Sequence, residues 1–242
     1  MSVTGIVAAL MAEARTLGTL PPGRRPGARD SMAIHTLADG TLLVISGMGP
    51  DAARRAAVAL VAAGAQGLLS FGLAGALDPA LGAGGVLLPE TVTDGAGTVH
   101  PTDAAWRARL ASRGGPGAGG EPRGGSLLSV AQPLTLPAAK SQAWVRTGAV
   151  AVDMESVAIA TVAIAAGLRF AVARVIIDTA ADSVPGSVTR AADARGEVAY
   201  LHLAAGLIRR PVELFALLRL ARRYRAALRA LRALAQHGVG LP

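Results

Sequence analysis

Short runs of almost wholly apolar residues, separated by segments with helical spacing, constrain the fold of this chain most. Residues 3–9 and 67–71 are such runs, and residues 170–178 form the longest one. A strand without alternating polar residues is buried on both faces, which is typical of parallel sheets covered by helices. The sequence therefore predicts strands at the centre of a layered α/β protein.

The other elements alternate between strand and helix along the chain. Asp39-Gly40 predicts a hairpin between residues 34–37 and 41–46. Since the alternation continues without a repeat, we expect one three-layer α/β domain over residues 1–208, with a central mixed sheet flanked by helices. Further strands are predicted over residues 86–88, 90–92, 126–130 and 150–153, and helices over residues 12–17, 50–63, 103–111, 138–145, 156–167 and 190–207.

Composition excludes several kinds of site. The 242 residues contain no Cys, which excludes a disulfide framework, a thiolate zinc site and a cysteine nucleophile. His35, His100, His202 and His237 lie far apart without the spacing of metal ligands. The sequence therefore predicts no metal site and no cofactor.

The net charge of +8 is concentrated at the C-terminus. Residues 209–242 hold eight Arg and one Glu, while the other 208 residues hold 16 cationic and 15 anionic side chains. Only 3% of residues are aromatic, so few rings are present to stack on bases. We therefore expect no nucleic-acid partner, and a basic nucleic-acid-binding module is the most distant alternative.

Residues 211–236 have the spacing of one basic amphipathic helix, which we separate from the body as a tail over residues 209–242. Two interpretations are open: the helix packs on the body or on a second subunit, or it lies on an anionic membrane surface. Its apolar face would hold Leu214, Leu217, Leu218, Ala221, Tyr224, Leu228 and Leu231, and its other face Arg219, Arg222, Arg223 and Arg229.

No signal peptide or membrane span is predicted. The apolar residues 156–168 are too few to cross a bilayer, which takes about 20 residues. We expect a cytoplasmic protein, with the tail as the part that would hold it to the inner membrane face.

Two glycine-rich turns follow predicted strands. Gly47-Met48-Gly49 resembles the start of a dinucleotide-binding turn, but the next strand ends near Ser70-Phe71 without the acidic residue that would bind a ribose. A dehydrogenase is therefore disfavoured, and the turn is either a ligand contact or a tight structural turn. The second predicted turn is Gly72-Leu73-Ala74-Gly75-Ala76.

Carboxylates lie where predicted strands end. Burying such a group costs solvation unless a charged or hydrogen-bonding partner meets it. Asp153, Asp178 and Asp182 have an alternative role as helix caps or turn residues. Glu13, Glu155 and Asp178 follow three different strands, and we expect them to share one site.

The motifs GIVAALMAEA, SGMG, FGLAGAL, VDMESVAIA and VIIDTAAD occur in the order and spacing of the nucleoside phosphorylase/nucleosidase superfamily. Residues 3–208 resemble its methylthioadenosine/S-adenosylhomocysteine nucleosidase branch. The Arg-rich end, RRPVELFALLRLARRYRAALRALRAL, is similar to the hopanoid-biosynthesis-associated phosphorylases, which are assigned to the removal of adenine from adenosylhopane. The resemblance implies a nucleoside phosphorylase-like fold and homodimers.

The resemblance also implies roles for individual residues. Asp178 would donate a proton toward N7 of the purine, Glu155 would bind the ribose hydroxyls above Met154, and Glu13 would position the attacking water. Such chemistry needs a proton donor for the departing base and an anion near the cationic sugar. The remaining substrate contacts implied are Gly47, Met48, Gly49, Leu73, Ala74 and Gly75.

The chain departs from the nucleosidase pattern at two places. Leu73 stands where nucleosidases have Ser, and this loss of polarity fits a more apolar substrate. Residues 129–133, which should approach the base, lack the aromatic residue usual in nucleosidases. Phosphorylases of this superfamily place Arg in stretches that match residues 8–12 and 69–71, which hold none here. We therefore expect hydrolysis, with inorganic phosphate left open as a co-substrate.

The expected function is cleavage of the N-glycosidic bond of an adenine nucleoside, with lipid-linked adenosylhopane as the substrate. One alternative is a soluble nucleosidase for methylthioadenosine or adenosylhomocysteine. A second is a protein of the same fold that binds a nucleoside without cleaving it.

Overall fold

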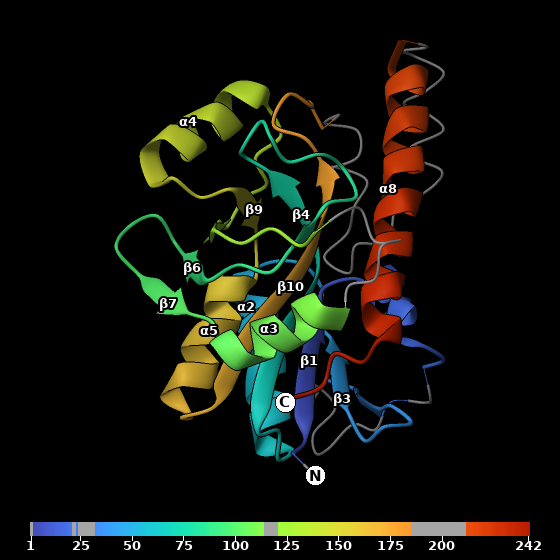
Figure 1. Cartoon of the computed structure of the whole chain (residues 1–242), viewed down its shortest axis with the longest axis vertical. Helices are drawn as coiled ribbons and strands as arrows, with labels where there is room; N and C mark the ends of the chain where they lie inside the picture. Colours follow the sequence, from blue (N-terminus) through green and yellow to red (C-terminus); the bar gives the residue numbers. More distant parts are fainter. Residues whose placement is uncertain (1, 21–22, 24–31, 114–120, 185–211) are drawn as a thin grey trace.

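The computed structural model describes residues 2–20, 23, 32–113, 121–184 and 212–242, and in the last of these segments it describes side chains from residue 221 onward. Across these residues one mixed sheet crosses the molecule (Figure 1). The helix predicted over residues 190–207 lies outside the described residues.

The longest apolar runs form the middle of the sheet. Strand β1 (Thr4–Ala8) lies between β3 (Leu42–Ile45) and β4 (Gly67–Ala76) and runs parallel to both. Strand β10 (Arg169–Asp178) runs parallel to β4 along its other side. The predicted central strands are thus confirmed, as is the hairpin of β2 (Ile34–Thr36) with β3.

β4 changes partners halfway along its length. β1 pairs with it as far as Phe71, and β9 (Ala151–Asp153) then pairs antiparallel with Gly75 and Ala76. The prediction of a turn at residues 72–76 is wrong, because β10 continues to pair with this stretch and keeps it extended. The sheet is completed by β8 (Ser126–Ser129), β6 (Thr91–Thr93) and β7 (Val99–Pro101) beyond β9, and by β5 (Val86–Leu87) beside β10.

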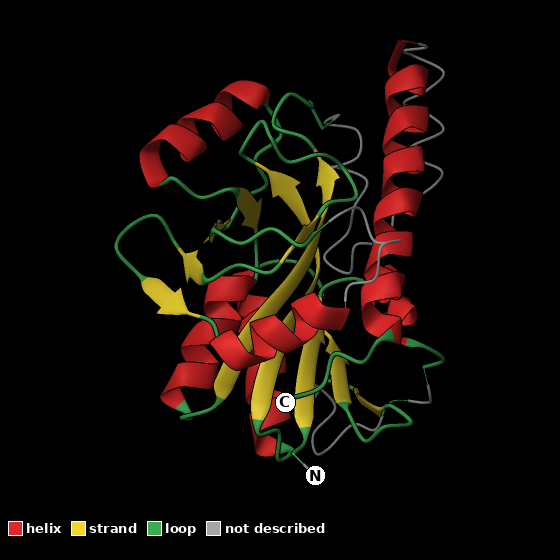
Figure 2. Cartoon of the chain, in the orientation of Figure 1, coloured by secondary structure: helices red, strands yellow, loops and turns green. Residues whose placement is uncertain are grey.

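Figure 2 shows the helices, in red, around the yellow strands of the sheet. Where they are described, the helices agree with the predicted segments to within a few residues. α1 is short and continues as a 3-10 turn, η1 (Arg15–Leu17). The helices are α1 (Met11–Ala14), α2 (Pro50–Ala62), α3 (Ala104–Arg113), α4 (Pro137–Thr147), α5 (Ser156–Ala165) and α8 (Val212–Gln236).

Helices cover both faces of the sheet. On one face, α2 and α5 pack against alternate residues of β10 such as Phe170 and Val172. On the other, α3 and α8 pack against the intervening residues, among them Ala171 and Ala173. This arrangement confirms the expected α/β fold with a mixed sheet between helices, and it explains why the central strands are apolar on both faces.

The part of α8 whose side chains are described, from residue 221 onward, packs on the body of the protein. Ala227, Leu231 and Leu234 are buried in the core beneath β10. Beyond the helix, Val239 O accepts a hydrogen bond from Trp106 Nε1 at 3.0 Å. From residue 221 onward, the structure therefore agrees with the interpretation in which the helix packs on the body. The domain boundary between residues 208 and 209 remains a prediction.

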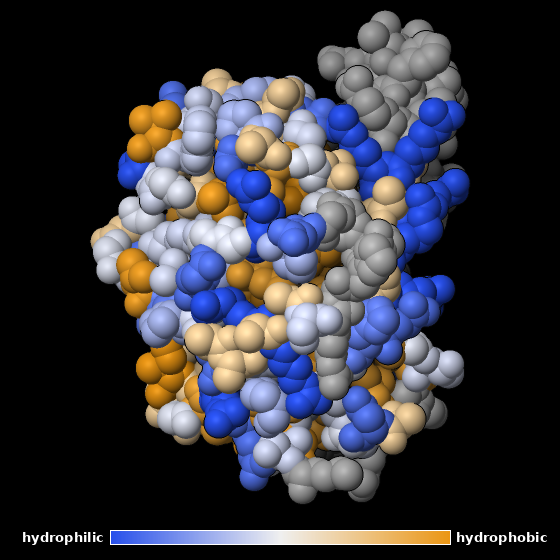
Figure 3. Space-filling model, in the orientation of Figure 1, coloured by the Kyte–Doolittle hydropathy of each residue, from blue (hydrophilic) through white to orange (hydrophobic). Residues whose placement is uncertain are grey.

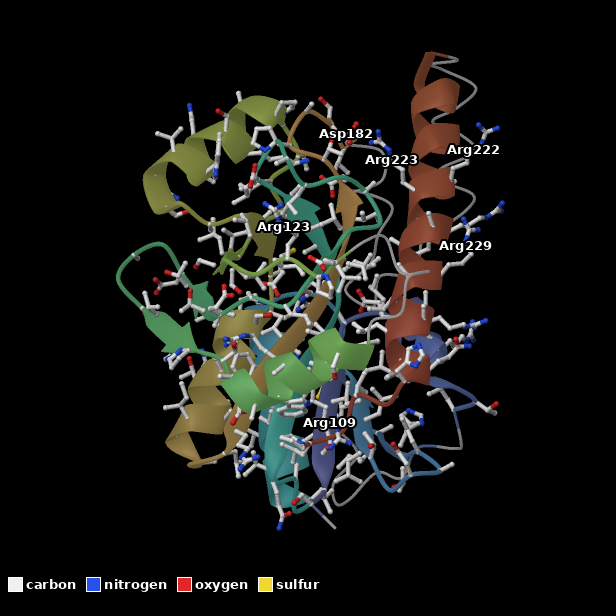
Figure 4. The ribbon with its side chains drawn as sticks, in the orientation of Figure 1. Arg109, Arg123, Asp182, Arg222, Arg223 and Arg229 are labelled. Carbon is white, nitrogen blue, oxygen red and sulfur yellow. The ribbon has the colours of Figure 1, made fainter. Side chains whose placement is uncertain are left out.

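The outer side of α8 is cationic. Arg222 and Arg229 point away from the body (Figure 4), and hydrophilic residues gather along this edge of the molecule (Figure 3). No helix among the described residues is both long and apolar enough to cross a membrane.

Candidate active site

A cavity of about 270 Å³ opens where β1 and β9 meet the middle of β4. Because β9 runs antiparallel to β4, its carboxyl end turns back toward the carboxyl end of β1. Carboxylates that follow different strands therefore come to one place. Glu13, Glu155 and Asp178 line this cavity together with Asp153, Met48, Leu73, Ala74, Gly75 and Met154.

Glu13 is held at the cavity by two backbone donors. Its Oε2 accepts a hydrogen bond from Leu10 N and its Oε1 one from Leu73 N, both at 2.9 Å. The residue is 2% exposed, and burial raises the pKa of its carboxyl although Arg174 and these N–H groups oppose the rise. A buried carboxyl of raised pKa is a better proton acceptor than an exposed one.

Glu155 lies at the start of α5 and is also buried. Its Oε1 accepts a hydrogen bond from Gly49 N at 2.9 Å, which joins it to the turn after β3. Burial is the largest cause that raises the pKa of Glu155 to about 7, with Asp153 adding to the rise and Arg174 opposing it. The group therefore changes charge near neutral pH.

Arg174 is the buried cation beneath these carboxylates. Its Nη2 donates to Asp153 Oδ2 at 2.6 Å and to Ser70 Oγ at 2.8 Å, and it lies 3.6 Å from Glu155 Oε2. Burial lowers the pKa of Arg174, but Asp153, Glu155 and Glu13 together raise it by more than burial lowers it. The guanidinium therefore stays charged. It balances part of the negative charge that these carboxylates concentrate.

Gly72 lets Arg174 and Glu13 approach the strand closely. A Cβ atom at this position would lie 2.5 Å from Arg174 Nη1 and 2.6 Å from Glu13 Oε1. Both distances are shorter than van der Waals contact, so a side chain at residue 72 would displace one of the two groups.

Asp178 is the last residue of β10, lines the cavity and is 7% exposed. Its Oδ2 accepts a hydrogen bond from Nζ of Lys140, which comes from α4. Burial raises the pKa of Asp178 and outweighs the lowering by Lys140. The raised pKa favours the protonated form that a proton donor requires.

The segment after Asp178 is tied to α8. Asp182 accepts hydrogen bonds from Thr179 N at 2.8 Å and from Arg223 Nη1, and Figure 4 shows Asp182 and Arg223 pointing toward one another. Asp182 is therefore a turn residue, as one interpretation of the sequence held. The next residue of α8, Tyr224, lines the cavity.

Two of the predicted contact residues lie outside the cavity lining. Gly49 acts through its N–H to Glu155, and Gly47 N donates to Ala9 O at 3.1 Å. Asp153 combines both of its interpretations, because it lines the cavity and also accepts a hydrogen bond from Ser156 N at 3.3 Å. No cluster of three metal-ligating side chains is found within the described residues.

Sequence reasoning missed Lys140 and Arg174. Each left a signal: Arg174 is a lone cation inside a buried apolar strand, and Lys140 is the single Lys in a chain whose other cationic side chains are Arg. Tyr224 was assigned to the apolar face of the tail but not to the site.

Comparisons with known proteins agree on the fold. A family model described as the phosphorylase superfamily matches residues 3–211. No curated protein matches the chain. Identities below 25% to solved structures establish the shared fold alone.

Three solved nucleosidases illustrate that fold. A 5′-methylthioadenosine/S-adenosylhomocysteine nucleosidase of Helicobacter pylori with butyl-thio-DADMe-Immucillin-A is 19% identical, with a TM-score of 0.66 over 75% of this chain and 87% of that one. An S-adenosylhomocysteine nucleosidase of Streptococcus pyogenes with 5-methylthiotubericidin is 24% identical, with a TM-score of 0.65 over 74% and 85%. A nucleosidase of Colwellia psychrerythraea in complex with adenine is 20% identical, with a TM-score of 0.64 over 74% and 84%.

Proposed function

The chain belongs to the phosphorylase superfamily, and from this premise we propose that it cleaves the N-glycosidic bond of an adenine nucleoside. The observation that carries the proposal is the meeting of Glu13, Glu155 and Asp178, from three separate strand ends, around one cavity. The nucleosidase of the same fold that is in complex with adenine supports adenine as the base.

Each carboxyl has a distinct part in this reaction. Asp178 donates its proton to N7 of the purine as the bond between C1′ and N9 breaks, and the bonding electrons leave with the base. A water molecule adds to the cationic sugar and gives its proton to Glu13. Glu155 accepts hydrogen bonds from the ribose hydroxyls, and Met154 packs against the sugar. Proton transfer at two sites and anions near the sugar lower the barrier.

The charge of the cavity favours water over phosphate as the nucleophile. Among the described residues that line it are four carboxylates, and no Arg, Lys or His. A phosphate dianion would meet this negative charge with only backbone N–H groups as partners. Inorganic phosphate as a co-substrate remains the alternative.

The apolar walls favour a hydrophobic 5′ substituent. The cavity is lined by Leu73, Val130, Pro133, Leu134 and Val184, and by Tyr224 of α8. We therefore propose a lipid-linked nucleoside, adenosylhopane, as the substrate. The second candidate is a nucleosidase for methylthioadenosine or adenosylhomocysteine, which the similar structures favour.

The tail would bring the cavity to such a substrate. The apolar face of residues 221–236 packs on the body, so this part of the helix would meet a membrane through the exposed Arg222, Arg225, Arg229 and Arg232. Each Arg near an anionic surface contributes about 1 kcal/mol. Liposome flotation tests the idea: replacing Arg222, Arg225 and Arg229 with Gln should release the protein from anionic vesicles, and undiminished binding contradicts it.

A homodimer is the assembly that we propose. Leu136, the N-cap residue of α4, and Val145 within this helix expose 59% and 80% of their surface, and a second copy of the chain would cover such apolar side chains. Sedimentation equilibrium distinguishes a dimer from a monomer, and replacing Val145 with Glu should shift the balance toward monomer.

Release of adenine tests the function itself. Purified protein is incubated with adenosylhopane, methylthioadenosine and adenosylhomocysteine, each with and without inorganic phosphate, and the sugar product is identified by mass spectrometry. We expect adenine from adenosylhopane at the highest kcat/KM, with a free sugar rather than a sugar phosphate. Binding without adenine release from any of the three would support the non-catalytic alternative and overturn the proposal.

A further inference from the structure

Lys140 is a fully buried cation with every donor in use. Its Nζ donates to Asp178 Oδ2, to Thr179 O at 2.8 Å and to Asp182 O at 3.1 Å. An ammonium group has three hydrogens, and three acceptors receive them. The side chain is thus fixed in one position against the end of β10.

Stability alone explains this arrangement poorly. Removing an ammonium and a carboxylate from water costs free energy that their attraction often fails to repay, and an apolar pair of similar volume is frequently as stable. The pair is also placed with respect to the cavity. Asp178 lines the cavity, whereas Lys140 does not, so the carboxyl group lies between the cation and the space for a substrate.

We propose that Lys140 is a positioning residue for the proton donor. By binding Oδ2 it leaves the other oxygen of Asp178 for the purine, and it stabilises the carboxylate that forms when the proton has left. This inference rests on the proposed function, since it assumes that Asp178 protonates the base.

The charge balance of the step supports the assignment. One proton passes from Asp178 to N7, the electrons of the C1′–N9 bond go to the base, and Asp178 is left with a negative charge at a site that is almost without solvent. Water cannot stabilise that charge there, but the ammonium already in contact can. Lys140 would therefore make a buried carboxylic acid a stronger acid in the reaction.

Among the described residues, the other charged groups that face Asp178 are Asp182, which raises the pKa of Asp178, and Arg223, which lowers it. Asp182 lies four residues after Asp178, Arg223 lies on α8, and the two form an ion pair with one another. Lys140 is the cation in direct contact, so the test concerns its removal.

The first experiment compares pH profiles of adenine release for wild type, Lys140→Met and Lys140→Arg. Without the cation, the lowering of the Asp178 pKa by Lys140 is lost while the raising by burial remains, so the alkaline limb of kcat/KM should move upward by about one pH unit or more. Since the acid is then weaker, kcat should fall by about tenfold to a hundredfold with little change in KM. Lys140→Arg keeps the positive charge, so the alkaline limb of its kcat/KM profile should lie close to the wild-type pH.

Arg146→Met is the matched control, because Arg146 is an exposed cation on the same helix. It should leave the profile unchanged. Thermal unfolding of each variant verifies that it is folded. A folded Lys140→Met variant with the wild-type limb and the wild-type kcat would overturn the proposal.

A second experiment does not depend on a variant of Lys140. Because the chain has a single Lys, protein labelled with ¹³C at lysine Cε gives one NMR signal that belongs to Lys140. Asp178→Asn should shift this signal, whereas Asp39→Asn, in the exposed turn between β2 and β3, should not. A signal that is identical in wild type and Asp178→Asn would overturn the contact on which the proposal depends.

The two experiments separate this inference from the proposed function. If wild-type protein releases no adenine from any nucleoside, the proposed function fails while the NMR result still reports the pair. If adenine is released and the Lys140 variants behave as wild type, the proposed function stands and the role of Lys140 fails.

Discussion

Glu13 accepts a hydrogen bond at 2.9 Å from the backbone N–H of Leu73, sixty residues further along the chain. Leu73 lies in the stretch of β4 that β1 no longer reaches and that β9 does not yet pair with. A carboxylate therefore replaces a strand as the partner of that N–H group. The same contact fixes Glu13 at the wall of the cavity.

Glu13→Gln should reduce the turnover rate while the protein stays folded. An amide keeps one acceptor but presents NH₂ to one of the two N–H donors, and it cannot take a proton from water. We expect kcat for adenine release to fall by about a hundredfold or more. Glu121→Gln, at an exposed position, should have no effect. A wild-type kcat for Glu13→Gln would show that water is activated elsewhere.

Asp178→Asn should separate binding from cleavage. The amide is nearly isosteric and uncharged, so the nucleoside should still bind, but no acidic proton remains for the base. We expect kcat to fall by about 10²- to 10⁴-fold with the dissociation constant changed little, as measured by calorimetry with the slow variant. Equal activity of variant and wild type would remove Asp178 from the reaction.

Nucleoside affinity should depend on pH through Glu155. Its pKa, raised to about 7 mainly by burial, means that the carboxyl is neutral in mildly acidic solution and ionised above neutrality. Because the carboxylate is the better acceptor for ribose hydroxyls, the dissociation constant should fall as the pH rises through about 7. Glu155→Gln should bind more weakly and lose this dependence; a dependence that persists in the variant would assign it to another group.

The raised pKa of Glu155 also makes the free energy of unfolding depend on pH. The folded protein holds the Glu155 proton up to a pH of about 7, whereas the unfolded chain releases it near the ordinary value of 4.5. Between these values the folded state binds more protons, so the contribution of Glu155 to the free energy of unfolding falls as the pH rises and is constant above the window. Urea unfolding of wild type and Glu155→Gln at several pH values measures the difference, which should disappear if burial does not perturb Glu155.

Arg174→Met should be strongly destabilising. It leaves Asp153 and Glu155 buried without their cation, and breaking a buried pair costs about 3–5 kcal/mol. Arg169→Met is the control on the same strand: Arg169 exposes 55% of its side chain and lies 3.7 Å from Asp103, a surface pair worth about 0–1 kcal/mol. Similar urea midpoints for the two variants would contradict the role given to Arg174.

Gly72→Ala should disturb the site from the strand side. The added methyl group would overlap Arg174 and Glu13, and overpacking of this kind costs about 1–3 kcal/mol. Gly82→Ala is the matched control, since no heavy atom lies within 4 Å of its Cβ position, and it should change stability by less than about 0.5 kcal/mol. We expect adenine release to fall in Gly72→Ala alone.

Local patterns predicted most of the described elements. Apolar runs of five to nine residues predicted β1, the first half of β4, and β10, because strands buried on both faces leave no polar alternation. β7 was missed, since Val99–Pro101 is a short, half-exposed segment with no apolar run. β4 was predicted too short because Gly and Ala at residues 72–76 indicate a turn locally, whereas pairing with β10 keeps them extended.

The candidate site was predictable only in part. Position at strand ends singled out Glu13, Glu155 and Asp178, because such carboxylates need partners. Lys140 was not predicted, since it lies on a helix whose pattern does not show which face meets β10. Arg174 was overlooked within an apolar strand, although a lone buried cation requires anions nearby.

The order of strands and helices follows from the amino-acid sequence, since hydrophobic periodicity and apolar runs are local properties of the chain. The sequence also indicates which acidic residues would be costly to bury without partners. The antiparallel placement of β9 beside β4 depends instead on tertiary packing, and this direction brings Glu155 to the same cavity as Glu13. Likewise, the packing of α4 brings Lys140 to Asp178, and the packing of α8 brings Tyr224 to the cavity. Local patterns do not predict these contacts, because contacts between distant segments depend on how whole elements pack together.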